Sequence, residues 1–532
     1  MSSSTTLAPG RLSRRSFLTR LGVGAVAASS GTLLGATGAR AGTNAAAAPV
    51  IRTDRFSRMF RLPPFAEPTP RLHAALVELG KPGGLMDAKD ALGRGPVDLI
   101  VDLELSAGNR NHPTSTAGST FFGQFVDHDL SFDLSSRLAH STKPEETRNG
   151  RTAALDLDSL YGLGPIGSPH LYEPADSAKL RVESGGLFED LPRNGAGGAL
   201  LGDPRNDEHV ILAGLHAAFL LFHNNAVEHV RANGAAEEDV FAATRRLTTW
   251  HYQWLVLNEL LPGFVGRGPV ADILAHGGRF YAPAPGEATI PVEFQGAAYR
   301  FGHSLVRPSY RVNLAGDGGK PFFGLIFDPG QEGKSDPDDL RGGARAPRRF
   351  VGWQTFFDFG DGHVKPNKRI DPMLSTPLFN LPMGAIASRD APSSLAQRTL
   401  LRHLTWELPS GQRIAQAMGV PALAPADLAE LSDLGQGLER STPLFYYVLK
   451  EAEVVEDGLR LGPVGGRIVA EVLIGVLRSD PESYLSVEPS WRPTLVTPGR
   501  GRPTGQKRGG RSDFGMTDFL TFAGVDPASR GQ

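Results

Sequence analysis

The sequence predicts a mainly α-helical protein with one large domain, long irregular loops and little β structure. Apolar residues recur at spacings of three and four in several long stretches, which is the period of an amphipathic helix. Strict alternation of apolar and polar residues, the pattern of a half-buried strand, is scarce. Gly and Pro, 64 and 41 in number, separate the helical stretches. The expected helices cover residues 72–79, 208–232, 235–261, 395–408, 411–418 and 465–477.

The composition favours an ordinary globular core and a small-molecule partner. The chain has 532 residues, of which 40% are hydrophobic, and its 55 Lys and Arg nearly balance its 57 Asp and Glu. No global basic field is therefore present to bind nucleic acid. The absence of cysteine excludes disulfides, thiolate-bound metals and a cysteine nucleophile, so any iron must be held by His or oxygen ligands.

Residues 1–41 have the pattern of a twin-arginine signal peptide. Arg14 and Arg15 precede a mildly apolar run over 21–38, and Ala39-Arg40-Ala41 forms an A-x-A cleavage site. Polar residues interrupt the apolar run well short of the ~20 residues that a membrane span needs. We therefore expect export through the twin-arginine route, and no membrane span after the signal is removed.

Residues 42–70 are expected to form an extended N-terminal arm, and residues 71–532 the main domain. Prolines at 63, 64, 68 and 70 disfavour a helix in the arm. The Gly- and Pro-rich segment 314–349 is either a surface excursion or the wall of a substrate channel. Basic residues between Arg500 and Arg511 lie among Gly and Pro, and are interpreted as a solvated loop instead of a binding patch.

Four clusters of polar residues carry the functional argument. The first, Asp127-His128-Asp129, follows apolar residues at i, i+3 and i+4, so one helix face meets the core just before it. The second spans 152–158; in an extended chain its Thr, Ala and two Asp point the same way and present oxygen ligands that suit calcium. A surface cluster and a solvent-facing acidic loop explain the two patterns equally well.

The third and fourth clusters say little alone. Residues 202–208 immediately precede a long helical pattern, with Asp203 or Asn206 available as its cap. Residues 300–303 read Arg-Phe-Gly-His, which places one histidine next to a glycine that permits close approach. Their meaning comes from their order along the chain.

Together the four clusters resemble the animal-type haem peroxidases, the superfamily of myeloperoxidase and lactoperoxidase, in its bacterial secreted branch. The shared pattern is Gly-Gln-x-x-Asp-His-Asp, then Asp-x-(Ser or Asp)-x-x-Tyr-Gly, then Arg-x-x-Glu, then Arg-(Tyr or Phe)-Gly-His, between Gly123 and His303. It continues through 408–412 and 461–467. The resemblance implies a single helical haem peroxidase domain over 71–532.

The resemblance also implies a role for each matching residue. His128, Arg205 and Gln124 fall at the distal histidine, arginine and glutamine. His303 falls at the proximal ligand of the haem iron. Arg300 and Arg402 fall at arginines near the haem, and Asp127 and Glu208 at the carboxylates that can form ester bonds to a haem b. The calcium ligands of the family correspond to Asp129, Thr152, Ala154 through its carbonyl, Asp156 and Asp158.

These residue types suit peroxide chemistry. A neutral imidazole can take a proton from peroxide and return it to the leaving oxygen. An arginine stays charged and stabilises the charge that develops as the O–O bond breaks. The second ring nitrogen of a proximal histidine needs an acceptor, which sets how strongly the ring donates to iron.

Two positions depart from the family. The family usually has Asn where Thr399 stands, to accept from the proximal histidine; Asn380 is an alternative partner. His209 follows Glu208, so the methionine linkage special to myeloperoxidase is absent and strong chloride oxidation is in doubt. His216, His223 and His229 have spacings of seven and six, which do not place two ligands on one metal, and are interpreted with His251 and His403 as structural.

The expected function is a haem peroxidase that reduces hydrogen peroxide and oxidises halide, thiocyanate or small aromatic donors through a ferryl intermediate. One alternative is a fatty-acid dioxygenase of the same superfamily, but the radical-forming tyrosine of those enzymes falls at Arg300, one step from Tyr299. The other is a non-catalytic secreted haem- or calcium-binding protein. His128 and Arg205 argue against it, since carriage needs neither.

Overall fold

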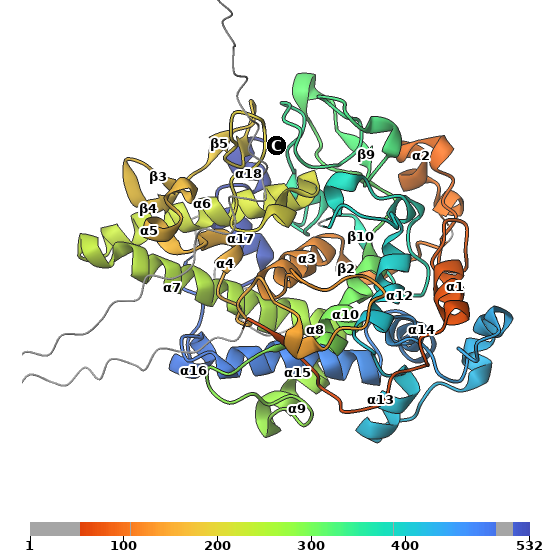
Figure 1. Cartoon of the computed structure of the whole chain (residues 1–532). Coiled ribbons are helices and arrows are strands. Elements are labelled where there is room, and N and C mark those ends of the chain that lie inside the picture. Colours follow the sequence, from red (N-terminus) through yellow and green to blue (C-terminus); the bar gives the residue numbers. More distant parts are fainter. Residues whose placement is uncertain (1–53, 107, 387, 496–513) are drawn as a thin grey trace, which may run out of the picture. The chain divides into compact units, whose positions relative to one another are not determined.

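A computed structural model describes residues 54–106, 108–386, 388–495 and 514–532. These residues all belong to one compact unit, residues 50–532 (Figure 1). The predicted signal peptide, the start of the predicted arm and the basic run from Arg500 to Arg511 lie outside the described residues.

The described part of the chain is mainly helical, as predicted (Figure 1). Each of the six predicted helical stretches contains a helix, with bounds that differ by a few residues. The helices are α1 Pro70–Leu79, α2 Pro96–Val101, α3 Gly118–Leu130, α4 Asp158–Tyr161, α5 Gly164–Gly167, α6 Val210–Ala232, α7 Glu237–Leu255, α8 Leu261–Val265, α9 Arg267–His276, α10 Val292–Gly296, α11 Gly302–Leu305, α12 Leu395–Thr405, α13 Gly411–Met418, α14 Leu444–Glu456, α15 Pro463–Ser479, α16 Tyr484–Val487, α17 Met516–Phe522 and α18 Pro527–Arg530.

Local capping fixes several of these boundaries. The hydroxyl of Thr69 accepts from the backbone N–H of Leu72 at the start of α1, and Ser394 and Ser410 cap α12 and α13 in the same way. Pro70 stands at the first turn of α1, where a missing N–H costs nothing, so this proline begins a helix while the prolines before it prevent one.

The strands are short and, within the described ranges, pair only in twos. β1 pairs with β7 in parallel, and the pairs β2–β10, β3–β4, β5–β6 and β8–β9 are antiparallel. Their bounds are β1 Phe56–Ser57, β2 Asn111–Thr116, β3 Tyr172–Glu173, β4 Asp176–Leu180, β5 Glu183–Ser184, β6 Glu189–Asp190, β7 Ile290–Pro291, β8 Ser309–Arg311, β9 Phe323–Leu325 and β10 Pro366–Lys368.

Helix α3 lies in the middle of the fold, between α6, α8 and the β2–β10 pair (Figure 1). The apolar face predicted for it is buried, and Phe125 stacks on Phe219 of α6 with ring centroids 4.5 Å apart. Phe121 and Phe122 make edge contacts with other aromatic rings. This packing fixes the residues that follow on α3 relative to α6.

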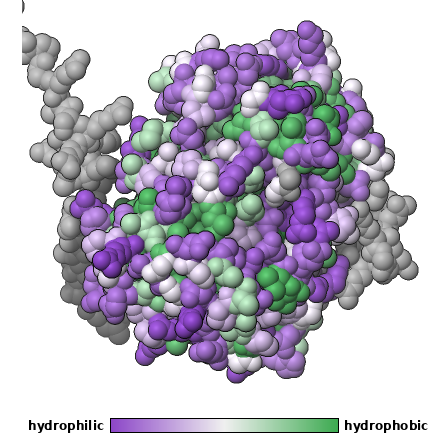
Figure 2. Space-filling view, turned by 90° about the vertical axis from the view of Figure 1, so that its right-hand side faces the viewer, coloured by the Kyte–Doolittle hydropathy of each residue, from purple (hydrophilic) through white to green (hydrophobic). Residues whose placement is uncertain are grey.

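Helix α6 is long and apolar enough to cross a membrane by length and composition alone. Within the protein, however, 78% of its most apolar window is buried, as expected of a core helix. One face of the molecule shows separate apolar patches among hydrophilic residues, which is ordinary for a protein surface (Figure 2).

Candidate active site

A cavity of about 280 Å³ gathers the predicted site residues, apart from the expected calcium ligands. They come from α3, from η6 (Pro204–Asp207) and the residue after it, from η8 (Ala298–Phe301) and α11, and from α12. Ile326 and Phe327 also line the cavity, so part of the 314–349 segment forms a wall. The predicted residues brought together are Gln124, Asp127, His128, Arg205, Glu208, Arg300, His303, Thr399 and Arg402.

His128 presents a basic nitrogen because its other ring nitrogen has a fixed partner. Nδ1 of His128 lies 2.9 Å from Oδ1 of Asn206, and Nδ2 of Asn206 lies 3.0 Å from Nδ1 of His216. An amide oxygen only accepts, so the proton of His128 resides on Nδ1 and the lone pair on Nε2. Burial, with the Arg205 charge, lowers the pKa of His128 to about 4 and keeps the ring neutral.

Local sequence patterns do not predict this chain of hydrogen bonds. They indicate only a helix cap at Asn206 and a structural role for His216. Both are buried, at 0% and 1% exposure, and burial lowers the pKa of His216 to about 3, so its ring is a neutral acceptor.

Arg205 is held on several sides. Its Nη2 donates to the backbone oxygens of His128, at 3.2 Å, and Ser131, at 2.7 Å. Asp203 accepts from Nε and Nη2 at 3.0 and 2.7 Å, and the guanidinium lies 4.3 Å from the centroid of the Phe132 ring. The guanidinium of Arg205 is therefore held beside the backbone of His128. It lines the cavity and stays positively charged.

Two carboxyl groups in the cavity differ in charge. Burial raises the pKa of Glu208 to about 8, and Arg205 only partly opposes this shift. Burial also acts on Asp127, but Arg300 and Arg205 outweigh it and hold the pKa below its ordinary value. At neutral pH Glu208 is therefore mostly protonated and Asp127 ionised.

His303 presents its Nε2 nitrogen without a hydrogen bond from any described residue. Its Nδ1 lies 3.4 Å from the hydroxyl oxygen of Thr399, which donates its own proton to the Leu395 carbonyl at 2.9 Å. Thr399 can therefore accept from Nδ1, at a long distance. Asn380, the alternative partner, is exposed and accepts from Ser393 instead. Burial, with the Arg300 charge, lowers the pKa of His303 to about 3.

Arg300 and Arg402 both line the cavity but have different partners. Nε of Arg300 donates to the Gln295 carbonyl at 2.8 Å, and its Nη1 lies 3.9 Å from Asp127. Nη1 of Arg402 donates to Asp133 at 2.7 Å. Asp133 lines the same cavity and was missed by sequence reasoning, because only the fold brings residues 269 positions apart into contact.

Part of the chain is similar to known proteins. Residues 134–321 match the animal haem peroxidase family. The human protein named probable oxidoreductase PXDNL is 28% identical over 234 residues, 38% of this chain and 15% of that protein. Thyroid peroxidase from Sus scrofa is 27% identical over 193 residues, 32% of this chain and 20% of that protein. Peroxidase A from Dictyostelium discoideum shares the fold, with a TM-score of 0.56 and 15% identity over 82% of this chain and 89% of that one.

Residues 134–321 are thus similar to the animal haem peroxidase family, and the relatives that match parts of the chain include peroxidases. The chain spans less than a quarter of the length of the two curated relatives, and the matched segment contains Arg205, Glu208 and His303 but not His128.

The residues that line the cavity fit a haem. His303 is neutral, with Nε2 available to iron, and Arg300 and Arg402 are cations suited to propionate groups. A side chain added at Gly302, which lines the cavity beside His303, would meet no atom within 4 Å. Apolar residues such as Phe264, Phe301 and Leu395 complete the walls.

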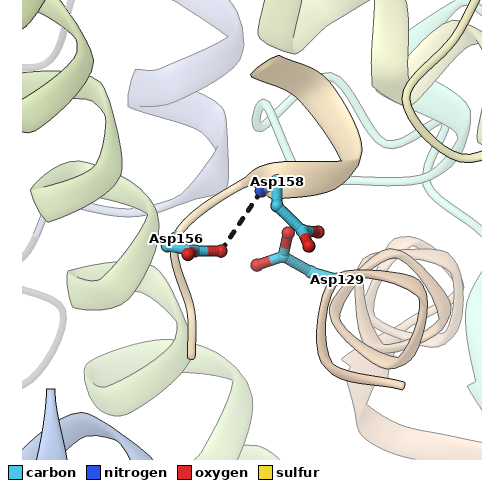
Figure 3. Close-up of side chains that lie close together, drawn as sticks. All are labelled: Asp129, Asp156 and Asp158. Atoms are coloured by element: carbon cyan, nitrogen blue, oxygen red, sulfur yellow. Dashed lines mark hydrogen bonds between the residues drawn. The ribbon is translucent and has the colours of Figure 1, made fainter. Parts of the chain in front are cut away.

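Asp129, Asp156 and Asp158 form a second, separate cluster, and Asp129 directly follows His128 of the cavity in the sequence. Each offers a carboxylate oxygen, and these oxygens all lie within 4.8 Å of one another (Figure 3). Thr152 donates to Asp156 at 2.8 Å, so its hydroxyl borders the cluster. Ala154, which precedes Asp156 by two residues, is also buried. The solvent-facing acidic loop is therefore not what the chain forms here.

The carboxylates of the cluster come together for another reason than the extended chain that the sequence predicted for residues 152–158. Residues 153–156 are bent instead of extended, and Leu157 has a left-handed backbone with φ of 58° immediately before α4. Burial and the neighbouring carboxylates raise the pKa of Asp129 well above its ordinary value and that of Asp158 to about 6. Three carboxylates this close repel one another unless protons or a cation intervene.

Proposed function

We propose that the protein is a haem peroxidase that reduces hydrogen peroxide and oxidises a small anionic or aromatic donor. The observation that carries this proposal is the pairing, in one cavity, of two neutral histidines from different elements. His128 offers a basic Nε2 fixed by Asn206, and His303 offers a free Nε2.

His303 would hold the iron of a haem b, and Arg300 and Arg402 would hold its propionates. A bound haem would supply the iron site for peroxide and the electrons that reduce it. Nε2 of His128 takes the peroxide proton and returns it to the leaving oxygen. Arg205 stabilises the charge on that oxygen, because its guanidinium is fixed in place before the reaction.

We also propose that Asp127 or Glu208 forms an ester bond to the haem. Both line the cavity, and the two differ in protonation at neutral pH. The test is extraction with acidified acetone after exposure to peroxide. A covalent haem stays with the protein, whereas haem that leaves entirely with the organic phase contradicts the ester.

The second cluster supports a further part of the proposal, one calcium ion per chain. Asp129, Asp156 and Asp158 are hard oxygen ligands, with the Thr152 hydroxyl and the Ala154 carbonyl as the remaining expected ligands. Since Asp129 follows His128 directly on α3, an ion there would hold the distal histidine in place. Export through the twin-arginine route, expected from residues 1–41, completes the proposal.

Tyr299 argues against the fatty-acid dioxygenase alternative. It lines the cavity, but its hydroxyl donates to the backbone carbonyl of Gly123 at 3.2 Å. A carbonyl is not a base, so no described group takes the phenol proton as a tyrosyl radical forms. The hydrogen-bonded chain His128–Asn206–His216 argues against a pure haem carrier, which needs no oriented base.

Replacing His303 by Ala tests the proposal. The purified wild type should show a Soret band that changes on addition of peroxide, and His303→Ala should lose the band or show that of free haem. His229→Ala, at an exposed position on α6, is the matched control. An unchanged spectrum and activity in His303→Ala would refute the ligand assignment, and a wild type without a Soret band would refute the function.

A further inference from the structure

We propose that His209 is a positioning residue. Its ring N–H fixes the orientation of the side-chain amide of Gln124, so that the amide nitrogen of Gln124 faces Glu208 and the cavity. The inference rests on the proposed function, in which a small oxygen-containing molecule or anion enters that cavity. The sequence indicates only that His209 stands where it excludes a methionine linkage.

The direction of each hydrogen bond follows from chemistry. The backbone N–H of Leu212 can only donate, so Nδ1 of His209, 3.2 Å away, must accept. Burial lowers the pKa of His209 to about 3, so the ring is neutral and its one proton resides on Nε2. Nε2 lies 2.9 Å from Oε1 of Gln124, and this atom of the amide must therefore be the oxygen.

The amide nitrogen of Gln124 consequently faces the other way. It lies 3.2 Å from Oε2 of Glu208 and donates one of its two hydrogens to this oxygen, so the proton that Glu208 carries at neutral pH resides on Oε1. The second hydrogen makes no bond to a described residue, and Gln124 lines the cavity. If the amide of Gln124 were inverted, its oxygen would face Glu208 and its nitrogen would face the N–H of His209. The second of these contacts would place one hydrogen-bond donor against another. His209 therefore makes the second N–H of Gln124 available to a hydrogen-bond acceptor that enters the cavity.

The position of His209 is itself well determined. The residue is the N-cap of α6, the 23-residue core helix, and is 3% exposed. Its ring contacts Phe121 and Phe327 edge-on, with centroids 5.2 and 6.3 Å away. The same ring thus has two separable roles: Nδ1 caps α6, and Nε2 orients Gln124.

Two substitutions separate these roles. In His209→Asn the side-chain oxygen occupies about the place of Nδ1 and can still accept from Leu212, since Asn is a favoured N-cap, but nothing reaches Gln124. In His209→Gln an amide N–H occupies about the place of Nε2 and can still donate to Gln124, but the cap is impaired. The pair therefore serves as its own matched control.

The first measurement is an optical titration of the ferric protein with sodium fluoride, a small anion that accepts hydrogen bonds. His209→Asn should bind fluoride about three- to tenfold more weakly than wild type, the effect of losing roughly one net hydrogen bond. His209→Gln should bind it nearly as wild type does. In a Gln124→Leu background, His209→Asn should have no further effect on fluoride affinity. The midpoint of thermal unfolding should follow the opposite order and fall in His209→Gln only.

A second measurement needs no haem. Urea unfolding of wild type, His209→Asn, Gln124→Leu and the double variant gives the coupling between the two side chains. The proposal expects the two substitutions to be non-additive. Additive effects, or fluoride binding in His209→Asn equal to wild type, would overturn it. Absence of a Soret band would refute the proposed function alone, and the urea cycle would still decide the role of His209.

Discussion

His128 and His303 line the same cavity, and their hydrogen-bond partners separate their proposed roles. An amide oxygen receives the Nδ1 proton of His128 at 2.9 Å, whereas a hydroxyl whose own proton is already donated lies 3.4 Å from Nδ1 of His303. Burial keeps both rings neutral. At the scale of the residue, the two histidines therefore differ in the hydrogen-bond partner of Nδ1.

His128→Ala should slow the reaction of peroxide with the ferric protein by ~10²- to ~10⁴-fold while haem is retained, because a positioned acid and base contributes about that much. Stopped-flow spectroscopy measures the rate, with His229→Ala as control. The wild-type rate should hold as the pH falls toward about 4 and drop below it, since protonation removes the base. A loss below about tenfold would indicate another base.

Thr399→Asn should lower the ferric/ferrous potential and speed O–O cleavage. An amide oxygen is a stronger acceptor than a hydroxyl that is 3.4 Å away, so the imidazole of His303 would donate more strongly to iron. Spectroelectrochemistry measures the potential. Asn380→Ala, at the exposed alternative position, should leave it unchanged; a potential that does not fall in Thr399→Asn would exclude Thr399 as the partner of His303.

At the scale of the element, α3 connects the cavity to the carboxylate cluster. Gln124, Asp127 and His128, spaced i, i+3 and i+4, lie on one face toward the cavity. Asp129 lies on another face, where its carboxylate accepts from Leu157 and Ser159 before and within α4. The cluster and the cavity are therefore joined by neighbouring residues of one helix.

Elemental analysis should find one calcium per chain, and Asp156→Asn should lose it. A cation that binds only the folded cluster stabilises the fold, so both the chelated wild type and Asp156→Asn, which lose the ion, should unfold at a lower temperature. Asp433→Asn, at an exposed position, should change neither quantity. A wild type without calcium, purified without chelators, would contradict the site.

His403 ties two helices together through both ring nitrogens. Nδ1 donates to the Thr399 carbonyl within α12, and Nε2 accepts from the backbone N–H of Phe445 in α14, each at 3.0 Å. This arrangement requires a neutral ring. Burial accordingly lowers the pKa of His403 from 6.5 to about 4.

The stability that His403 contributes should therefore be present above pH 6.5 and be lost as the pH falls toward about 4, because the unfolded chain binds a proton that the folded protein resists. Urea unfolding of wild type and His403→Gln measures this. The difference in free energy of unfolding should shrink by about 1.4 kcal/mol per pH unit in that window. A difference independent of pH would contradict the neutral, buried ring.

At the scale of the whole molecule, the segments at both ends of the described chain contribute buried residues to the core. At one end Phe56, Phe60 and Phe65 are buried, and the Glu293 carboxylate accepts from the backbone of Met59 and Phe60. At the other end α17 packs on α6, where Phe519 stacks on Phe222 with centroids 4.1 Å apart. These contacts join segments hundreds of residues apart.

Phe519→Ala should lower the free energy of unfolding by about 3–5 kcal/mol, the usual cost of removing a buried aromatic ring. Phe519 is 0% exposed, and a cavity would remain against α6. Denaturant unfolding measures the loss. Val487→Ala, at a position 56% exposed, should cost little, and an equally small cost for Phe519→Ala would show that α17 is not part of the cooperative core.

The sequence by itself determined the helices and the residue types of the site. Helical period, cap residues and prolines act over a few neighbouring positions, so 395–408 and 411–418 were predicted nearly as they occur. The exception is 235–261, where α7 passes through a π-helical turn, Val256–Leu260, into α8. The motifs that resemble the family are likewise short strings of residues, and they pointed to every cavity residue expected of it.

Only the tertiary structure decided how those residues are paired. The partners of His128, Gln124 and His303 lie 78, 85 and 96 positions away, and no local rule selects one donor or acceptor at such a separation. The charge of each group follows from the same contacts: burial leaves Glu208 neutral, while Arg300 and Arg205 keep Asp127 ionised. Protonation and orientation depend on the free energy of a group in its surroundings, and those surroundings exist only after the chain has folded.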